Sequence, residues 1–285
     1  MSEDAEKKGQ TQERQPGKEY KMYPLPEFIK KGYKGSGILR DKVAVITGGD
    51  SGIGRAIAVL FAEEGADLVI AYLGEDEDAE QTKKEIEKRG RKALLINGDV
   101  SESAHCKSII EKTIDEFGKI DILINNAAMQ FPQESLIDIS DEQLHKTFET
   151  NIYPYFYLSR AALPHMDKGC NIINTSSVTA YQGNARLIDY SSTKGAIVSF
   201  TRALSANLAH KGIRVNGVAP GPIWTPLIPA TFGKEDVATF GQNVPLNRAG
   251  EPSEVASCFL FLASDQASYI TGQFIHPNGG EIVNA

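Results

Sequence analysis

Short runs of β-branched and aliphatic residues alternate with longer amphipathic stretches from Asp41 to the end of the chain. Continuous apolar runs of this length are typical of parallel strands buried on both faces, and the stretches between them have the length and periodicity of helices. This alternation predicts an α/β fold of the doubly wound Rossmann type, with a seven-stranded parallel sheet in a single domain over residues 41–285. The predicted strands cover residues 43–47, 67–72, 92–97, 121–125, 171–176, 213–219 and 273–277.

The first 40 residues form an N-terminal extension that does not follow this alternation. Residues 1–18 are polar and rich in Gln, Glu and Lys, which is typical of a disordered tail. Residues 19–40 interleave aromatic residues, prolines and lysines, as in YKMYPLPEFIKKGYKGSG from Tyr20 to Gly37. We expect this second part to be an extended arm lying on a protein surface, such as that of a neighbouring subunit. A flexible linker is the alternative interpretation.

Composition and charge narrow the class of protein. Hydrophobic residues make up 41% of the 285 residues and charged residues 24%, so the chain as a whole is neither disordered nor fibrous. The formal net charge is -7 and the pI is near 5.4. Because nucleic acid is bound through basic surfaces, it is not expected as a partner. These values fit a soluble enzyme.

The cysteines, histidines and apolar runs bear on three further classes. Cys106, Cys170 and Cys258 are far apart and form no CxxC, which argues against a disulfide framework and favours a reducing compartment, the cytoplasm. The five histidines show no metal-ligand spacing, so no metal is expected. The longest apolar runs are far shorter than the about 20 residues of a spanning helix, so no membrane association is predicted. The charged N-terminus also lacks the apolar core of a secretory signal.

A glycine-rich turn, TGGDSGIG, follows the first predicted strand at residues 47–54 and leads directly into a helical stretch. Where there is no Cβ, a backbone can approach a diphosphate closely, and the N-terminus of the following helix offers unpaired N–H groups. The missing GK[ST] excludes a phosphate-binding loop of the nucleoside-triphosphatase kind. The turn therefore predicts a dinucleotide site. Its expected cofactor contacts are Gly48, Asp50, Ser51, Gly52, Ile53 and Gly54.

The end of the second strand is where such folds select the cofactor, since an acid there binds the adenine ribose and a base accepts a 2′-phosphate. Here the chain has Tyr72 and Leu73, which are neither, followed by acids at 75–78. The acids fit the first turns of a helix predicted over residues 75–89, and they would also repel a 2′-phosphate. We expect NAD, with NADP as the alternative. Asp99 and Val100, after the third strand, are expected beside the adenine.

Tyr190 and Lys194 are four residues apart in a segment with helical periodicity, residues 189–212, so they share one face of a helix. A free tyrosine has a pKa near 10 and is a poor base at neutral pH, so a cation must help. Stabilising the phenolate by about three pKa units takes roughly 4 kcal/mol. One unit charge at about 4 Å supplies a similar amount at an effective dielectric constant of about 20. Because this spacing also occurs by chance, the neighbouring residues have to decide its meaning.

Two more polar residues are predicted at the carboxyl end of the sheet, where open α/β sheets bind their ligands. Ser177 follows the fifth strand, thirteen residues before Tyr190. Asn151 begins a segment after the fourth strand, which itself ends in Asn125-Asn126-Ala127-Ala128. All of these would therefore lie near the glycine turn.

Taken together, TGGDSGIG, NNAA, Asn151, Ser177 and YSSTK resemble the classical short-chain dehydrogenase/reductase family in order and spacing over about 245 residues. Within that family the chain is similar to bacterial oxidoreductases of the general-stress or glucose/ribitol-dehydrogenase-like type. One departure is Ala128, where the family usually has glycine, and it adds a methyl group near the cofactor. The resemblance implies cofactor contacts by Asn126, Ala127, Ala128, Tyr190, Lys194, Pro220, Gly221, Ile223 and Thr225.

The resemblance also implies a catalytic tetrad. Tyr190 exchanges a proton with the substrate oxygen, and Lys194 lowers the pKa of Tyr190 and holds the nicotinamide ribose. Ser177 hydrogen-bonds the substrate carbonyl, and Asn151 supports a water-linked proton relay to Lys194. Ser176 is the alternative to Ser177, and Asn151 can instead cap a bent helix. The implied activity is hydride transfer between NAD(P) and a small alcohol, sugar alcohol, aldehyde or ketone.

Substrate choice is expected to depend on residues outside the tetrad. These are Gln130, Phe131, residues 178–182 and a mobile lid over residues 222–247, whose aromatic residues can also be mere packing. Aromatic residues at 153–157 exceed the needs of one core face, and in the family the helix that carries them forms subunit contacts, so a homotetramer is expected. The rival interpretations are a noncatalytic dinucleotide-binding regulator on the same fold and a sugar-nucleotide epimerase or dehydratase.

Overall fold

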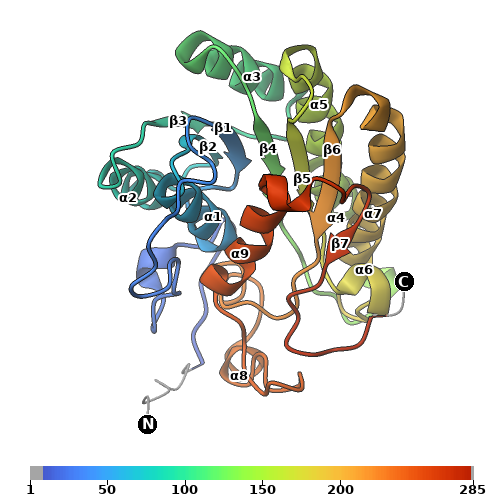
Figure 1. Ribbon diagram of the computed structural model, residues 1–285. Coiled ribbons are helices and arrows are strands. Elements are labelled where there is room, and N and C mark those ends of the chain that lie inside the picture. Colours follow the sequence, from blue (N-terminus) through green and yellow to red (C-terminus); the bar gives the residue numbers. More distant parts are fainter. Residues whose placement is uncertain (1–8, 284–285) are drawn as a thin grey trace.

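A computed structural model describes residues 9–283. Its centre is a seven-stranded parallel sheet, as predicted, and the strands lie in the order β3-β2-β1-β4-β5-β6-β7 (Figure 1). The strands are β1 (Val43–Thr47), β2 (Asp67–Tyr72), β3 (Ala93–Asn97), β4 (Ile122–Asn125), β5 (Asn171–Thr175), β6 (Arg214–Val218) and β7 (Phe274–Ile275).

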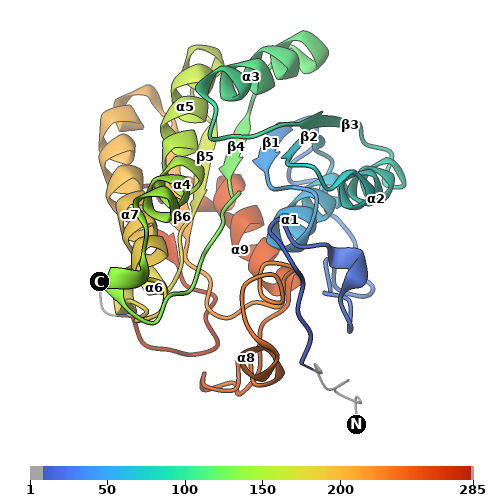
Figure 2. The same cartoon turned by 180° about the vertical axis from the view of Figure 1, so that it is seen from behind.

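Helices cover both faces of the sheet, as Figures 1 and 2 show from opposite sides. The α-helices are α1 (Gly52–Glu63), α2 (Asp76–Glu87), α3 (Ser103–Phe117), α4 (Asp141–Asn151), α5 (Tyr153–Ala162), α6 (Thr179–Gln182), α7 (Ile188–Leu208), α8 (Lys234–Ala238) and α9 (Pro252–Ala263). Short 3-10 helices are η1 (Glu19–Lys21), η2 (Leu136–Asp138), η3 (Leu163–His165), η4 (Ala209–Lys211) and η5 (Asp265–Ala267).

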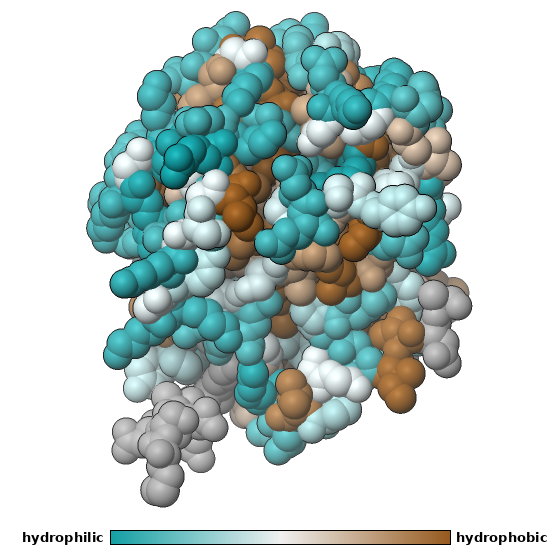
Figure 3. All heavy atoms as spheres, in the orientation of Figure 1, coloured by the Kyte–Doolittle hydropathy of each residue, from teal (hydrophilic) through white to brown (hydrophobic). Residues whose placement is uncertain are grey.

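The sheet separates two hydrophobic cores. Along β1, Ala44 and Ile46 pack with α1, α2 and α9, whereas Val45 packs with α3, α5 and α7 on the other face. This division follows from the period of two residues in a strand. Both faces of β1 are therefore buried, which explains the continuous apolar runs in the sequence. On the outside, hydrophilic residues predominate on the face shown in Figure 3.

The strand order also creates the crevice that holds the site. β1 pairs with β2 on one side and with β4 on the other, both in parallel. The connections that leave β1 and β4 therefore diverge, and the carboxyl ends of open α/β sheets bind ligands at such a point. The glycine turn and the NNAA segment meet there.

Most predicted boundaries hold within one residue, and three elements differ by more. The helix predicted over 75–89 is α2, which ends two residues earlier, at Glu87. The predicted strand 273–277 is reduced to Phe274–Ile275, which pairs only with Gly217 and Val218 of β6. Pro277, which has no N–H to donate, closes it. The helix predicted over 189–212 ends as α7 at Leu208 and continues as a 3-10 turn to Lys211 before Gly212.

The N-terminal extension differs from the disorder expected for residues 1–18. Residues 1–8 lie outside the described residues, but residues 9–18 run along the carboxyl end of the sheet beside the segment that carries α8. The Gln12 N–H donates to the carbonyl of Pro229 at 2.6 Å, and the Gln15 side chain bonds the backbone of Gln130. The partners lie more than 100 residues away in the chain, so local composition could not indicate this order.

The following arm lies on its own domain. Trp224, the largest buried side chain, is covered by it and donates from Nε1 to the carbonyl of Pro24 at 2.8 Å. Met22 of the arm and Ile228 of the lid segment pack with Trp224 in one hydrophobic cluster. Further along, the Tyr33 hydroxyl donates to the carboxylate of Glu64 at the end of α1. Among the described helices, none is long and apolar enough to cross a membrane.

Candidate active site

A cavity of about 610 Å³ opens at the carboxyl end of the sheet, a volume typical of cofactor and substrate sites. Every predicted cofactor contact except Gly54 lines it. These residues are Gly48, Asp50, Ser51, Gly52, Ile53, Tyr72, Leu73, Asp99, Val100, Asn126, Ala127, Ala128, Tyr190, Lys194, Pro220, Gly221, Ile223 and Thr225.

The glycine turn is shaped as a cradle. Gly48 and Gly52 have φ angles of 61° and 52°, in the region that favours glycine. Gly54 acts by packing rather than by contact with a ligand, because a Cβ there would lie 1.8 Å from the carbonyl oxygen of Gly48. The Ser51 side chain does not cap α1, and Ser51, Gly52 and Ile53 at the start of the helix line the cavity. This wall fits the diphosphate of a dinucleotide.

Asn126 and Thr47 brace the cradle against the end of β4. The Asn126 side chain donates to the carbonyls of Thr47 at 3.1 Å and Gly48 at 3.2 Å. In return the Thr47 hydroxyl accepts from the backbone N–H groups of Asn126 and Ala127. Asn126 therefore positions the glycine turn, and the adjacent Ala127 and Ala128 form the floor of the cavity.

The end of the cavity that Tyr72 lines has acidic residues, and beside it two basic residues form ion pairs with Glu75. Tyr72 donates its hydroxyl to Asp76 at 2.7 Å. Asp50 lies on the same wall, and burial raises the pKa of its carboxyl to about 6. Next to this wall, Glu75 is buried and forms ion pairs with Arg14 at 3.6 Å and Lys18 at 3.5 Å.

Asp99 and Val100 line the same end, as predicted. One oxygen of Asp99 accepts the backbone N–H of Ser101 at 2.8 Å. Asp99 lines the cavity, where its other oxygen can accept a hydrogen bond from a bound molecule. The preceding Gly98 has a φ of 155° and packs against the His105 ring.

Tyr190 and Lys194 lie one turn apart on α7 and are both buried at the cavity wall. The Lys194 Nζ lies 5.3 Å from the centroid of the Tyr190 ring and donates to the carbonyl of Thr175 at 3.0 Å. Burial raises the pKa of Tyr190 to about 12, and the Ser177 hydroxyl acts in the opposite direction by hydrogen bonding. Burial lowers the pKa of Lys194 to about 7.

Burial opposes one effect that we expected. Lys194 was expected to lower the pKa of Tyr190, whereas burial raises it, and the effect of Lys194 stays a prediction. The reason is that both groups lose water when they are packed against the sheet, and each loses its charged form in consequence. Tyr190 is therefore a neutral hydroxyl, able to donate a proton, near neutral pH.

Both candidate serines line the cavity, but their hydroxyl groups make different hydrogen bonds. Ser177 is hydrogen-bonded to Tyr190, and its hydroxyl also accepts the Thr179 N–H at 3.2 Å. Ser176 donates its hydroxyl to the carbonyl of Lys194 at 2.9 Å, which holds α7 to the end of β5. Ser177 therefore has the geometry for contact with a bound molecule.

Asn151 is placed away from the cavity lining. It is fully buried at the break between α4 and α5, where its amide donates to the carbonyl of Met129 and accepts the Met129 N–H, both at 2.8 Å. A longer bond of 3.3 Å reaches the Thr193 hydroxyl. Its side chain thus positions the loop after β4, and the relay to Lys194 stays a prediction.

Some expected substrate residues line the cavity and others do not. Gln130, Val178, Thr179, Gln182 and parts of 222–247 line it, whereas Phe131 does not. Trp224 of the lid segment is buried under the N-terminal arm instead. The movement of this segment stays a prediction.

Sequence reasoning missed two groups of lining residues. Asn184, Arg186 and Leu187 follow α6, and Gln15, Pro16 and Gly17 come from the N-terminal extension. The proline and the glycine in QPGK were the available signal for the second group, because such residues mark an ordered turn as readily as a flexible tail. Within residues 9–283, no group of three or more His, Cys, Asp or Glu side chains is arranged to hold a metal ion.

Comparison with known proteins places this geometry in a family. A family model described as "Enoyl-(Acyl carrier protein) reductase" matches residues 48–281. The chain is 56% identical over 274 residues to general stress protein 39 of Bacillus subtilis, covering 96% of each. It is 52% identical to NADPH-dependent aldehyde reductase 1 of Arabidopsis thaliana, covering 97% of this chain and 98% of the relative. It is 50% identical to glucose and ribitol dehydrogenase of Daucus carota, covering 96% and 97%.

A solved structure agrees with these relatives. A short-chain dehydrogenase of Burkholderia cenocepacia, in complex with NADP, superposes with a TM-score of 0.80 at 31% identity. The match covers 85% of this chain and 98% of that one. The chain is an oxidoreductase and belongs to the short-chain dehydrogenase/reductase family.

Proposed function

We propose that this protein reduces small carbonyl compounds to alcohols, and catalyses the reverse reaction, with a nicotinamide dinucleotide as the hydride carrier. The observation that supports this best is the position of Tyr190. Its hydroxyl lies on one wall of the cavity beside Ser177 and Lys194, and the glycine cradle forms another wall. An acid and a dinucleotide site thus share one cavity.

The chain's own residues handle the proton and the substrate oxygen. Ser177 and Tyr190 donate hydrogen bonds to that oxygen, which polarises the carbonyl group. Tyr190 then gives up its proton, and a charged Lys194 stabilises the phenolate that forms. The bound dinucleotide supplies or accepts the hydride. Asn151 acts as a positioning residue through the Met129 backbone, and we propose that it also supports proton return to Lys194.

In the reduction, Tyr190 acts as the proton donor. Burial raises its pKa to about 12, so it keeps its proton at neutral pH. Oxidation of an alcohol needs the phenolate, which forms in the same site only when Lys194 carries its charge. A higher pH favours loss of the Tyr190 proton, which oxidation needs, but it also removes the charge of Lys194.

The lining supports a small polar substrate such as an aldehyde, ketone, sugar alcohol or sugar. Gln130, Gln182 and Asn184 place amide groups in the cavity, while Val178 and Phe232 add apolar surface. The names of the Arabidopsis and carrot relatives, an aldehyde reductase and a glucose and ribitol dehydrogenase, point to the same class.

NAD is our first choice of cofactor. The acids at 75–78, after β2, would repel a 2′-phosphate, and Asp50 of the glycine turn adds a carboxyl group to the cavity lining. NADP is the second candidate, favoured by Arg14 and Lys18, which lie against Glu75 close to this end. The Burkholderia structure and the name of the Arabidopsis relative also concern NADP or NADPH.

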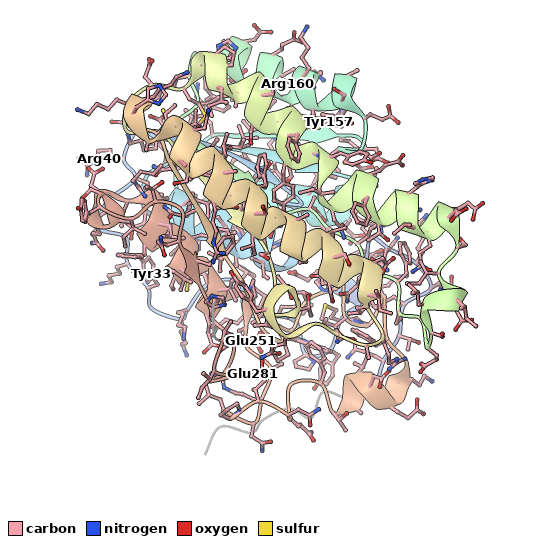
Figure 4. The ribbon with its side chains drawn as sticks, turned by 90° about the vertical axis from the view of Figure 1, so that its right-hand side faces the viewer. Tyr33, Arg40, Tyr157, Arg160, Glu251 and Glu281 are labelled. Carbon is pink, nitrogen blue, oxygen red and sulfur yellow. The ribbon has the colours of Figure 1, made fainter. Side chains whose placement is uncertain are left out.

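We also propose a homotetramer that uses α5 and α7. Phe156 of α5 is half-exposed, and the centroid of its ring lies 4.4 Å from the centroid of the Phe200 ring on α7. Figure 4 looks onto α7 with α5 running alongside it, where Tyr157 and Arg160 are labelled. An apolar face of this kind is costly to leave in water. The cytoplasm remains the proposed location, because Cys106, Cys170 and Cys258 are all free thiols.

The test is titration of the purified protein with NADH and NADPH, followed by a panel of aldehydes, ketones and polyols with the preferred cofactor. Tight binding with turnover of a small carbonyl compound is the expected result. Binding without turnover of any compound would favour the noncatalytic regulator. Turnover of a sugar nucleotide without net change of the cofactor would favour the epimerase.

A further inference from the structure

We propose that residues 9–21 form a strap that closes the cofactor cavity, that Glu19 fastens this strap to the glycine turn, and that cofactor is released only when the strap lifts. The inference rests on a dinucleotide occupying the cavity, as proposed above. The N-terminal extension then forms part of the binding site, in addition to packing against the domain.

The strap crosses the mouth of the cavity between two walls. On one side the Gln15 side chain donates to the carbonyl of Gln130 at 2.6 Å and accepts the Gln130 N–H at 3.2 Å. On the other side the Gln12 N–H donates to the carbonyl of Pro229 at 2.6 Å. Between these contacts, Gln15, Pro16 and Gly17 line the cavity itself.

The strap also fits closely against the lid segment. A Cβ on Gly17 would lie 2.3 Å from the carbonyl oxygen of Pro226, so only glycine allows this approach. Pro226 in turn lines the cavity beside Thr225. Movement of the strap and movement of the lid segment are therefore coupled through direct backbone contact.

Glu19 is the fastening point. Its side chain is buried, with 2% of the residue exposed, although it comes from a segment outside the domain. One carboxylate oxygen accepts the N–H of Gly52 at 2.6 Å, and the other pairs with Arg55 of α1. The Glu19 backbone N–H adds a bond to Asp78 of α2 at 2.8 Å. A carboxylate at the start of a helix is also favoured by the helix dipole.

Glu19 and the cofactor therefore contact the same turn. Gly52 lines the cavity and donates its N–H to Glu19, so the strap holds the turn from outside while a diphosphate would contact it from inside. Two ligands that order one loop bind cooperatively, each slowing the loss of the other. The strap is thus expected to slow cofactor release.

Arg55 keeps other partners when the strap is absent. Its guanidinium also contacts the carboxylate of Asp78, the carbonyl of Asp50 and the Thr82 hydroxyl, each at 2.9 Å. Replacement of Glu19 therefore leaves no unpaired buried cation, and the domain is expected to fold. Burial raises the pKa of Glu19 to about 7, so a neutral side chain of the same shape is tolerated at this position.

The experiment compares full-length variants for the rate of cofactor release. Protein loaded with NADH or NADPH, whichever binds more tightly, is mixed with excess oxidised cofactor, and the loss of fluorescence of the bound reduced form is followed. Glu19→Ala removes the fastening, and Gln15→Ala removes the bonds to Gln130. Glu19→Gln keeps an acceptor for the Gly52 N–H. Glu27→Ala is the matched control, because Glu27 joins the extension to Glu251 and Ser253 at α9, away from the strap.

We expect Glu19→Ala and Gln15→Ala to release cofactor about fivefold faster or more, the effect of losing one net hydrogen bond. Glu19→Gln should restore most of the original rate, and Glu27→Ala should not change it. If Glu19→Ala does not fold, Gln15→Ala decides the matter alone. An unchanged release rate in folded Gln15→Ala protein overturns the proposal.

Hydrogen exchange gives a readout that does not depend on turnover. In the unmodified protein, cofactor should slow exchange of residues 48–54 and of residues 9–21 together. Slowing at 48–54 without any change at 9–21 overturns the strap while leaving the cofactor site intact. Failure of either cofactor to bind would instead overturn the proposed function, on which the strap depends.

Discussion

The Lys194 Nζ lies 5.3 Å from the centroid of the Tyr190 ring in the wall of the cavity, and burial moves the two pKa values apart, that of Lys194 down to about 7 and that of Tyr190 up to about 12. Tyr190 therefore keeps its proton at pH 7 to 8, whereas Lys194 changes its charge near pH 7. A neutral tyrosine is a proton donor, and the charge of Lys194 is adjustable near physiological pH.

This relationship predicts the pH dependence of carbonyl reduction. Lys194 is charged below about pH 7 and loses its charge as the pH rises through that value, while Tyr190 keeps its proton up to about pH 12. Because the charge stabilises the forming phenolate, kcat/KM for reduction should fall as the pH rises above about 7. Steady-state kinetics between pH 5 and 9 measure this. In Lys194→Ala the fall should disappear, along with much of the rate and of the cofactor affinity. A profile that rises with pH in the unmodified protein would contradict the assignment.

Substitution of each of the two serines at the end of β5 should distinguish a role in catalysis from a role in packing. Ser177→Ala removes a hydroxyl from the cavity and should lower kcat/KM by about 10²-fold, typical of one oxyanion-type donor. Ser176→Ala removes the bond to the Lys194 carbonyl and should cost about 1 kcal/mol of stability with little effect on kcat. Kinetics and thermal unfolding of both variants check this pair. Equal losses of kcat in both would show that the assignment is wrong.

Two glycines provide a test of the cradle. In Gly54→Ala the methyl group would lie 1.8 Å from the carbonyl oxygen of Gly48, so the turn must deform and cofactor affinity should drop at least tenfold. Gly195→Ala, in α7, meets nothing within 4 Å and should gain up to about 1 kcal/mol of helix stability. Isothermal titration with the preferred cofactor, alongside thermal unfolding, measures both. Normal cofactor affinity in Gly54→Ala would argue against the cradle.

The proposed assembly through α5 and α7 depends on Phe156. Phe156→Glu places a charge on the exposed apolar face next to Phe200 and should shift the protein to smaller species in sedimentation analysis. Tyr269→Glu is the control, because Tyr269 is fully exposed and lies in the turn after η5. Unaltered mass in Phe156→Glu would place the interface elsewhere.

The strands and the cavity wall could be predicted because their signals are local. A buried parallel strand such as β1 is apolar at every position, and the glycine turn follows it directly. Tyr190 and Lys194 share a helix, so their spacing alone brings them together. These features depend on residues that are neighbours in the sequence.

The remaining features depend on residues far apart in the chain. The strap was expected to be disordered because Gln12 and Gln15 are polar, and their partners Pro229 and Gln130 lie more than 100 residues away. The pKa of Tyr190 depends on burial, which spacing does not report. The amide of Asn151 suits a proton relay and a structural hydrogen bond equally well, so the sequence does not distinguish the two roles. In the structure the side chain of Asn151 bonds the backbone of Met129.

The most direct test of the account compares the unmodified protein with Tyr190→Phe in one experiment. Each is saturated with the reduced cofactor it binds, mixed with a panel of small aldehydes and ketones, and followed by the absorbance of the reduced nicotinamide. We predict oxidation of the cofactor by the unmodified protein, and a rate at least 10²-fold lower in Tyr190→Phe, with cofactor affinity changed by only a few fold. Equal rates in the two proteins, at equal cofactor occupancy, would contradict the role of Tyr190 as the proton donor.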